Sequence, residues 1–268
     1  MSRLETNLLR QIGRANKRFA LIEPDDHILV AVSGGKDSWG LLSLLRAYAQ
    51  KVPFSFSCVA VTLDQGQPGF DGTRLEAYYK AHDYAYHIEY RDTYSVVVSK
   101  TPEGKAYCAL CSRMRRGILY RIAREFNATK IALGHHRDDF IETLLLNQFY
   151  AGRIRSMAPK LRETNGNAAI IRPLVYASES ALIEYAEAQK FPIIPCNLCG
   201  SQDNLKRQEI KALLLQLERQ NPRIRGNLLA ALGNIDPTHL LDGIPEGQGS
   251  TDEQRAEQPA LMTITSPT

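Results

Sequence analysis

The sequence lacks any long hydrophobic run, and this absence excludes membrane-spanning proteins of the helical type. No apolar stretch approaches the roughly 20 residues that a membrane-spanning helix needs. The first 19 residues also lack the apolar core of a secretory signal. With 44% hydrophobic and 23% charged residues among 268, the composition is that of a globular chain large enough for one sizeable core. We therefore expect a cytoplasmic protein, built on one large domain, that does not act at a membrane.

Cysteine is scarce, and its odd count of five argues against a disulfide framework. Cys58 lies in a strand-like run, and we interpret it as a buried core thiol. The other four form two C-x-x-C pairs, Cys108 with Cys111 and Cys196 with Cys199. Two thiolates at positions i and i+3 reach one metal centre. From the spacing alone, a zinc site, an iron–sulfur cluster and a persulfide-forming thiol pair all stay open.

The net charge is only +4, but the positive charge is gathered in clusters. These clusters lie at 3–18, 113–124, 153–162 and 206–225. Such clusters suit a polyanionic partner, although any one of them is also explained as the solvated face of a helix. The end of the chain, 243–268, is polar, aperiodic and carries four carboxylates against one arginine. We expect this acidic tail to be disordered.

Strand-like and helix-like segments alternate along the rest of the chain. We expect strands over 27–32, 56–64, 84–90, 130–136 and 169–174, from their runs of β-branched and aromatic residues. We expect helices over 3–20, 37–50, 73–82, 112–127, 138–150, 178–190, 205–219 and 223–232. This alternation predicts an α/β fold with a doubly wound, mainly parallel sheet and helical additions. We assign 1–242 to this domain, with a basic helix at its N-terminus.

The first expected strand runs straight into the sequence SGGKDS, which has the properties of an anion cradle. The six residues are Ser33, Gly34, Gly35, Lys36, Asp37 and Ser38. Two glycines let backbone N–H groups approach a phosphate, and the following helix adds its positive N-terminus. Lys36 supplies a counter-charge, and Asp37 is suited to hold a phosphate-bridging Mg²⁺. The spacing differs from that of a Walker A loop, because Val30 stands where the first glycine of that motif belongs.

A second polar stretch, GHHRDD at 134–139, ends a strand and opens a helix. The carboxyl ends of parallel strands meet at one edge of a sheet, so we expect this stretch to face the SGGKDS loop. Asp138 and Asp139 are candidates for Mg²⁺ or nucleotide contacts, and His135 or His136 for phosphate contacts. Helix capping is the alternative for either aspartate. Asp64 closes the second strand and is a candidate for the nucleotide ribose.

The SGGKDS loop resembles the PP-loop of the ATP pyrophosphatase superfamily, whose fold is called adenine nucleotide alpha-hydrolase-like. Five further segments appear in a telling order: VTLDQGQPGF, YCALCSRMRRGILY, IALGHHRDD, IIRPL and FPIIPCNLCGSQDNLKR. Together they are similar to the tRNA 2-thiocytidine synthetases, and the resemblance extends from about Leu8 to His239.

The resemblance implies a sulfurtransferase that binds ATP and Mg²⁺ and thiolates cytidine 32 in the tRNA anticodon loop. ATP would adenylate the C2 oxygen with release of pyrophosphate, and sulfur would then displace AMP. Catalytic roles are implied for Lys36, Asp37, Asp138 and Asp139. The nucleotide would be bound by the six residues of the SGGKDS loop together with Asp64 and His135, and Asp37 would hold Mg²⁺.

The resemblance also implies how the cysteines are used. Cys108, Cys111 and Cys199 would hold a 4Fe–4S cluster with one open iron, and Cys196 would not be a ligand. A cysteine desulfurase as sulfur donor and a homodimer are further implications. Five positively charged residues are candidates for tRNA phosphate contacts: Arg113, Arg115, Arg116, Lys160 and Lys206. We interpret the only tryptophan, Trp39, as a helix-packing residue.

Two other functions compete with this hypothesis. One is a PP-loop ligase in which zinc merely staples the cysteine pairs. The other is a non-catalytic, zinc-stapled RNA-binding module, which would leave the SGGKDS loop without a purpose. Iron and sulfide content separates the first hypothesis from these two, and pyrophosphate release separates the two from each other.

Overall fold

The structure is a computed structural model that describes residues 1–101, 108–162, 168–194 and 202–241. The chain divides into two compact units, Met1–Leu229 and Ala230–Thr268. The first unit contains the sheet and the features that concern us here. Of the second unit, the structure describes the end of one helix and the short helix η1 (Pro237–His239), where Asp236 caps the first turn by accepting from Thr238 N at 3.1 Å.

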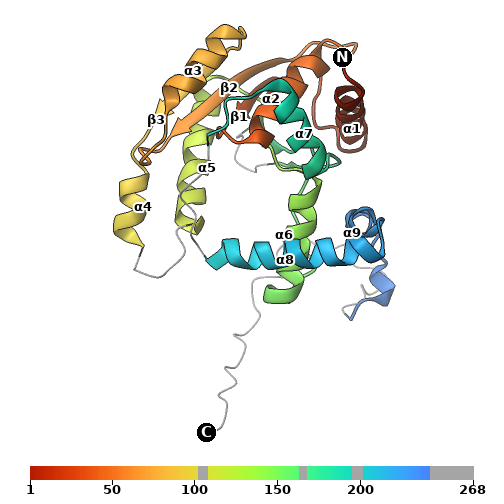
Figure 1. Cartoon of the computed structure of the whole chain (residues 1–268). Helices are drawn as coiled ribbons and strands as arrows, with labels where there is room; N and C mark the ends of the chain where they lie inside the picture. Colours follow the sequence, from red (N-terminus) through yellow and green to blue (C-terminus); the bar gives the residue numbers. More distant parts are fainter. Residues whose placement is uncertain (102–107, 163–167, 195–201, 242–268) are drawn as a thin grey trace, which may run out of the picture. The chain divides into compact units, whose positions relative to one another are not determined.

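A six-stranded sheet forms the centre of the first unit (Figure 1). Its strands are β1 (His27–Ala31), β2 (Ser57–Asp64), β3 (Tyr86–Tyr90), β4 (Lys130–Ala132), β5 (Lys160–Leu161) and β6 (Ala169–Ile171). They lie in the order β3-β2-β1-β4-β6-β5. All pairs are parallel except β5 with β6. The predicted mainly parallel sheet is therefore confirmed.

Helices pack on both faces of this sheet. They are α1 (Arg3–Phe19), α2 (Lys36–Ala49), α3 (Gly72–Ala81), α4 (Tyr94–Lys100), α5 (Cys108–Glu125), α6 (Arg137–Ala151), α7 (Glu179–Gln189), α8 (Gln202–Gln220) and α9 (Ile224–Ala231). Helix α2 packs on β1 and β2 and also contacts α1 and α7. Helix α5 covers the opposite face. This two-sided arrangement is the doubly wound fold that the alternation predicts.

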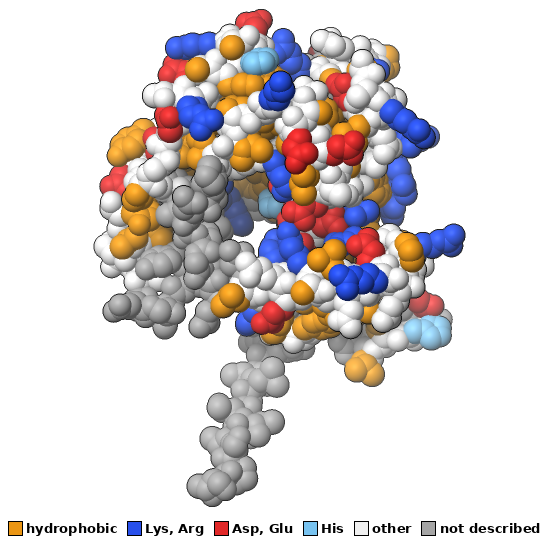
Figure 2. All heavy atoms as spheres, in the orientation of Figure 1, with side chains coloured by type: hydrophobic (Ala, Val, Ile, Leu, Met, Phe, Trp, Pro, Cys, Tyr) orange, Lys and Arg blue, Asp and Glu red, His pale blue; other side chains and the backbone are white. Residues whose placement is uncertain are grey.

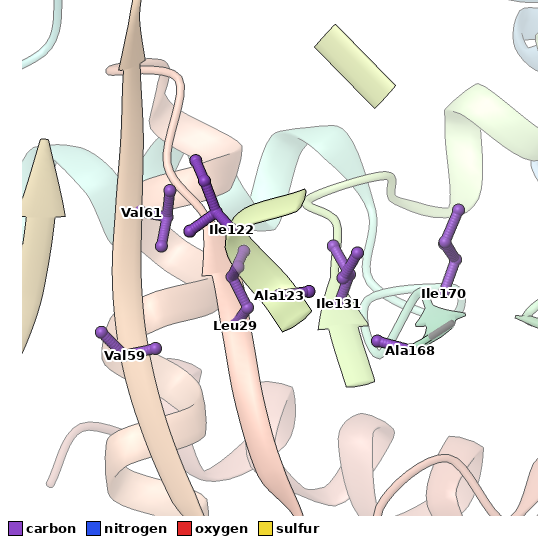
Figure 3. Close-up of a cluster of buried hydrophobic side chains, with 8 residues drawn as sticks. All are labelled: Leu29, Val59, Val61, Ile122, Ala123, Ile131, Ala168 and Ile170. Carbon is purple, nitrogen blue, oxygen red and sulfur yellow. The ribbon is translucent and has the colours of Figure 1, made fainter. Parts of the chain in front are cut away.

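The core beneath α5 follows from the alternation of side chains along each strand. Leu29 pairs in register with Val59 on one side and with Ile131 on the other. These side chains and Ile170 point to the same face, where Ile122 of α5 covers them (Figure 3). Each strand is thus fixed in register, because a slip by one residue would turn its apolar side chains away from the core.

Helix α8 is fixed to α6 by an apolar contact of its own. Ile210 and Leu214 are almost fully buried and pack against Ile141 and Leu145 of α6. Residues four apart lie on the same side of a helix, so this pair forms a short apolar stripe. The stripe holds α8 across α6 without needing any of the charged residues on its surface (Figure 1).

Several elements differ from the sequence-based expectation. Helix α4 was not predicted, because its run YSVVVSK is rich in β-branched residues that favour strands. Helix α5 begins at Cys108 rather than at 112, which places the first C-x-x-C pair inside its first turn. Strand β4 ends at Ala132, not at 136, and the two-residue β5 was also missed.

Trp39 is 1% exposed and stacks among Tyr78, Tyr79 and Phe191, which confirms it as a packing residue. Cys58 is half-buried in β2 rather than fully buried. The predicted disordered tail, 243–268, and the turn at 163–167 lie outside the described residues. Within the described ranges, no helix is long and apolar enough to cross a membrane.

The strand order reverses direction at one place. β2 and β3 lie on one side of β1, while β4 and β6 lie on the other. In parallel α/β sheets, the connections that leave two adjacent strands at such a point diverge, and ligands bind in the crevice between them. Here the SGGKDS loop follows β1 and the GHHRDD stretch follows β4. The sheet topology therefore brings both predicted stretches to the same crevice.

Candidate nucleotide-binding site

The SGGKDS loop forms a tight turn whose serines are tied to each other. Ser38 Oγ accepts a hydrogen bond from Ser33 N at 3.2 Å and donates one to the Gly35 carbonyl at 2.8 Å. Gly35 is the N-cap of α2, and its side of the turn carries no side-chain cap. The first N–H groups of α2 are therefore available to an anion, with the positive end of the helix dipole behind them.

Gly34 has a backbone conformation that explains its residue type. Its φ is +86°, and a Cβ there would also lie 3.2 Å from Cβ of Ile194. Gly34 accepts a hydrogen bond from Ile194 N at 3.0 Å, so the backbone of the loop is fixed from outside. Because a left-handed φ costs most residues about 1 kcal/mol, this turn depends on glycine.

Lys36 and Asp37 begin α2 and form an ion pair at 3.0 Å. Lys36 Nζ also lies 3.4 Å from Oε1 of Glu179, the first residue of α7. Burial by itself would lower the pKa of Lys36, but the charges and hydrogen bonds of Asp37 and Glu179 outweigh it, and the pKa is raised. Lys36 is therefore fully charged at neutral pH, as binding a phosphate requires.

Asp37 has one carboxylate oxygen that fits a cation. Oδ2 pairs with Lys36, while Oδ1 is buried and accepts no hydrogen bond from the described residues. His136 Nε2 lies 3.7 Å from this Oδ1. An orphaned buried carboxylate oxygen costs free energy unless a cation or a water satisfies it. The donor set at Asp37 is thus compatible with Mg²⁺, the hard cation predicted for this position.

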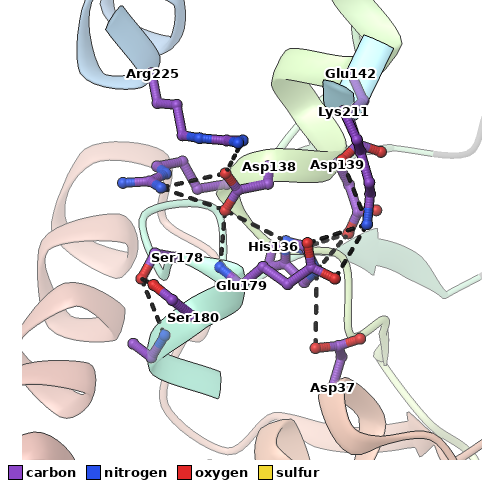
Figure 4. Close-up of polar contacts among 12 residues, drawn as sticks. Asp37, His136, Asp138, Asp139, Glu142, Ser178, Glu179, Ser180, Lys211 and Arg225 are labelled. Atoms are coloured by element: carbon purple, nitrogen blue, oxygen red, sulfur yellow. Dashed lines mark hydrogen bonds and ion pairs between the residues drawn. The ribbon is translucent and has the colours of Figure 1, made fainter. Parts of the chain in front are cut away.

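The GHHRDD stretch faces the loop through His136, the N-cap of α6. The imidazole is buried, and its Nε2 lies 3.5 Å from Asp139 Oδ2 as well as near Asp37 (Figure 4). His135, in contrast, lies beside Arg172, whose Nε is 3.3 Å from its Nδ1. Burial, followed by the charge of Arg172, lowers the pKa of His135 to about 4. His135 is therefore neutral at physiological pH.

Asp138 is 2% exposed and is surrounded by donors. Its carboxylate accepts from Arg225 Nη1 at 2.7 Å, from Glu179 N at 2.8 Å and from Arg137 Nη2 at 3.2 Å (Figure 4). Burial would raise the pKa of Asp138, but the hydrogen bond from Glu179 N and the two guanidinium groups hold it below its ordinary value. Asp138 thus joins α6, α7 and the segment that carries Arg225.

Asp139 and Glu142 share the positive charges of α8. Asp139 Oδ2 accepts from His136 N at 2.9 Å, the capping role that the sequence left open for it. Arg207 Nη1 lies 3.4 Å from Asp139 and 3.5 Å from Glu142, and Lys211 Nζ lies 3.7 Å from Glu142. Burial raises the pKa of Glu142 to about 7 despite these two cations.

Asp64 ends β2 as expected, and its Oδ1 accepts a hydrogen bond from Gly66 N at 2.9 Å. It lines an open depression of about 850 Å³ together with residues of α3 and β3. Gln65 follows it and is 8% exposed. Cys111 Sγ donates to Gln65 Oε1 at 3.4 Å, so this cysteine lies close to the carboxyl end of β2.

The cysteines are described only in part. Cys111 is half-buried. Cys108 lies one helical turn before it in α5, which places the two on the same side of the helix. Cys196 and Cys199 lie outside the described residues. Within those limits, the first C-x-x-C pair stands at the carboxyl edge of the sheet, and two thiolates in this spacing fit one metal centre.

The candidate phosphate contacts differ in availability. Arg113, Arg115 and Arg116 are exposed on α5 just after the C-x-x-C pair. Lys206 lies over the ring of Tyr150, 4.6 Å from its centre. The side chain of Lys160 is only 12% exposed and pairs with Glu23 at 3.2 Å. Lys160 is therefore committed to an internal contact, and the proposal below does not include it.

Sequence reasoning missed five residues of this site: Glu142, Glu179, Arg207, Lys211 and Arg225. Each lies on a helix surface outside any motif, so no local signal marks it. Gly134 was quoted only as part of its stretch, yet a Cβ there would lie 3.0 Å from the backbone of Asp37. The face in Figure 2 is hollowed above α8, and basic and acidic side chains gather along that hollow.

Comparison with known proteins gives the family. The model of the PP-loop domain matches residues 4–217. A tRNA-cytidine(32) 2-sulfurtransferase of Anaeromyxobacter dehalogenans is 52% identical over 240 residues, which are 90% of this chain and 83% of the relative. One of Paraburkholderia xenovorans is 52% identical over 241 residues, 90% of this chain and 72% of the relative.

Among solved structures, the U34-tRNA thiolase NcsA from Methanococcus maripaludis, with its 4Fe–4S cluster, superposes with a TM-score of 0.71. It is 22% identical, and the match covers 87% of this chain and 80% of that one. This likeness supports the fold. From the family model and the curated relatives together, the chain belongs to the PP-loop proteins and, within them, to the family of the tRNA-cytidine(32) 2-sulfurtransferases.

Proposed function

We propose that this protein catalyses the ATP-dependent 2-thiolation of cytidine 32 in tRNA. The observation that carries the proposal is the identity of about 52%, over 90% of the chain, with proteins named for that reaction. The crevice between β1 and β4 supports it independently, because it offers a phosphate cradle, a charged lysine and a free carboxylate oxygen in one place.

The chemistry explains why ATP is needed. The C2 carbonyl of cytidine resembles that of a urea, so its carbon is a poor electrophile and its oxygen a poor leaving group. Attack of the C2 oxygen on the α-phosphorus of ATP forms an O–P bond and releases pyrophosphate. A sulfur nucleophile then forms the C2–S bond, and the former C2 oxygen leaves with AMP.

Within this proposal the loop residues stabilise the negative charge of the departing pyrophosphate. The N–H groups at the start of α2 and the hydroxyls of Ser33 and Ser38 would donate to phosphate oxygens, and Lys36 would supply the counter-charge. Asp37 would hold Mg²⁺ through its Oδ1, and the ion would neutralise further charge on the phosphates. Asp64 and His135 remain proposed nucleotide contacts.

Asp138 and Asp139 enter the proposal as positioning residues. Asp139 caps α6, and Asp138 is enclosed by two guanidinium groups and a backbone N–H. Both carboxylates therefore hold the GHHRDD stretch against the loop. His136 is the side chain of this stretch that approaches both Asp37 and Asp139.

We further propose that Cys108, Cys111 and Cys199 hold a 4Fe–4S cluster. Three thiolate ligands leave one iron open, and when bound the cluster supplies a site for the sulfide to be transferred. The solved thiolase NcsA carries such a cluster by its title. The place of Cys111 beside Gln65, at the same edge of the sheet as the loop, is compatible with this use.

The exposed arginines of α5 complete the proposal. Arg113, Arg115 and Arg116 follow Cys111 within two turns, and we propose that they contact tRNA phosphates near the anticodon loop. A cysteine desulfurase as sulfur donor and a homodimer as the working form belong to the same proposal.

The test is the content of iron, acid-labile sulfide and zinc in anaerobically purified protein. We expect about four irons and four sulfides per chain, lost in Cys108→Ala, Cys111→Ala and Cys199→Ala and kept in Cys196→Ala. Bound zinc without iron, with all four cysteines required, would instead favour a zinc-stapled ligase or RNA-binding module. Release of pyrophosphate from ATP would then separate those two.

A further inference from the structure

The ammonium groups of Lys36 and Lys211 share one carboxylate. Glu179 Oε1 lies 3.4 Å from Nζ of Lys36 and 3.1 Å from Nζ of Lys211, and Oε2 lies 3.0 Å from the latter. Lys36 belongs to the loop after β1, whereas Lys211 comes from α8. Two cations from distant parts of the chain are therefore held within the reach of a single side chain at the mouth of the crevice.

Lys211 is not needed to hold α8 in place. The buried pair Ile210 and Leu214 anchors that helix to α6. The side chain of Lys211 is 40% exposed, and a lysine ammonium on its four-carbon stem moves readily between acceptors. The contact with Glu179 can therefore be exchanged without loosening the helix.

Glu142 keeps Lys211 close to the crevice from the other side. This carboxylate is 1% exposed, and neither of its oxygens accepts a hydrogen bond from the described residues. Lys211 and Arg207 are the cations that stand within 4 Å of it. A buried carboxylate without hydrogen bonds retains nearby cations, because the free energy of an uncompensated buried charge is high.

A triphosphate that enters the loop competes with Glu179 for both cations. It carries several negative charges, and charge-assisted hydrogen bonds to phosphate are among the strong ones. We propose that Lys211 is a second phosphate-binding cation of the ATP site, held by Glu179 until the β- and γ-phosphates, and afterwards pyrophosphate, take its place. This inference rests on the ATP site of the proposed function and adds to it a residue outside the loop.

The test is isothermal titration of the full-length protein with three ligands: pyrophosphate, AMP and α,β-methylene ATP, which cannot be cleaved at the reacting bond. For Lys211→Ala we expect the Kd of the ATP analogue and of pyrophosphate to rise about tenfold or more, the usual loss for one charge-assisted contact. The affinity for AMP should stay as in the wild type. Arg219→Ala, which removes an exposed cation from the last turn of the same helix, is the matched control and should change none of the three.

Glu179→Gln separates direct contact from positioning. If Glu179 competes with the phosphates, its neutralisation should tighten the ATP analogue several-fold. If Glu179→Gln weakens the analogue as strongly as Lys211→Ala does, Lys211 acts only through Glu179 and the inference is wrong.

Three further outcomes complete the design. Equal affinities of Lys211→Ala and wild type, or an equal loss for AMP, would overturn the inference while leaving the proposed function intact. Failure of the wild type to bind the analogue would overturn both. If Lys211→Ala does not fold, Lys211→Gln, which keeps the stem, must show the same selective loss.

Discussion

Gly134 packs so closely against Asp37 that a Cβ on the glycine would lie 3.0 Å from the Asp37 carbonyl carbon and 3.0 Å from Ser38 N. The end of β4 thus presses on the first turn of α2, where the phosphates of ATP are proposed to bind. Gly134→Ala must push this turn away, since the neighbours are backbone atoms. We expect a stability loss of about 1–3 kcal/mol and at least tenfold weaker binding of ATP by titration.

The control for this prediction is Gly117→Ala in α5. Nothing lies within 4 Å of a Cβ at that position, and the residue is in the interior of a helix. Alanine should therefore stabilise the protein by about 0.5–1 kcal/mol without changing ATP affinity. If Gly134→Ala behaves like Gly117→Ala, the close approach of β4 and α2 does not shape the site.

Glu142 predicts a pH dependence of stability. Its pKa is about 7 in the folded protein against 4.5 ordinarily, so the folded chain keeps a proton that the unfolded chain loses. The contribution of this group is fully present below pH 4.5 and is lost as the pH rises through 7. Glu142→Gln has no such loss. Its free energy of unfolding should therefore rise relative to wild type between pH 5 and pH 8, by on the order of 2 kcal/mol.

Urea denaturation at a series of pH values measures this difference. Glu184→Gln, an exposed glutamate of α7, serves as the control and should run parallel to the wild type. A constant difference between Glu142→Gln and wild type over this range would mean that Glu142 is ionised throughout and that Arg207 and Lys211 outweigh its burial.

Asp138 carries a larger structural burden than its neighbours. Removing its charge leaves Arg225 with only Glu218, at 3.0 Å, and leaves Arg137 in a largely buried place. We expect Asp138→Ala to lower the free energy of unfolding by about 3–5 kcal/mol, the usual cost of breaking a buried ion pair on one side. Thermal unfolding checks this value, and a loss below 1 kcal/mol would show that Asp138 is not a structural hub.

Cys58 should be chemically inert in the folded protein. Burial raises the pKa of its thiol to about 12, so the reactive thiolate is scarce at neutral pH. Alkylation with iodoacetamide at pH 8, followed by peptide mass spectrometry, should modify Cys58 at least tenfold more slowly in the folded protein than in urea. Similar rates in the two states would mean that β2 opens readily or that the thiol is ionised.

The arginines of α5 lead to a prediction about salt. Replacing Arg113, Arg115 and Arg116 together by alanine should weaken tRNA binding and flatten the dependence of log K on log salt by up to about three contacts. Arg121→Ala is the matched control, because this arginine of α5 already pairs with Glu89 and Glu125. An unchanged salt slope in the triple variant would place the tRNA elsewhere.

The sequence predicted the elements whose signal is local. The run ILVAV before Ser33 could only be a buried strand, and a strand, a Gly-Gly turn and a helix indicated the phosphate cradle. Helix α4 escaped because Val96, Val97 and Val98 favour strands, and its packing on α5 overrides that preference. The charged partners of the site, such as Glu179 and Lys211, escaped for another reason. They lie 143 and 175 positions after Lys36, and only the folded chain brings them to it.

The most direct measurement is the formation of 2-thiocytidine in a tRNA transcript with cytidine 32. Anaerobic protein would be incubated with the transcript, ATP, Mg²⁺ and sulfide, and the nucleosides analysed by mass spectrometry after digestion. The account predicts 2-thiocytidine at position 32 only, none without ATP or with Lys36→Ala, and none in a transcript with uridine 32. Thiolation without ATP, or none in the complete mixture with iron-loaded wild type, would contradict it.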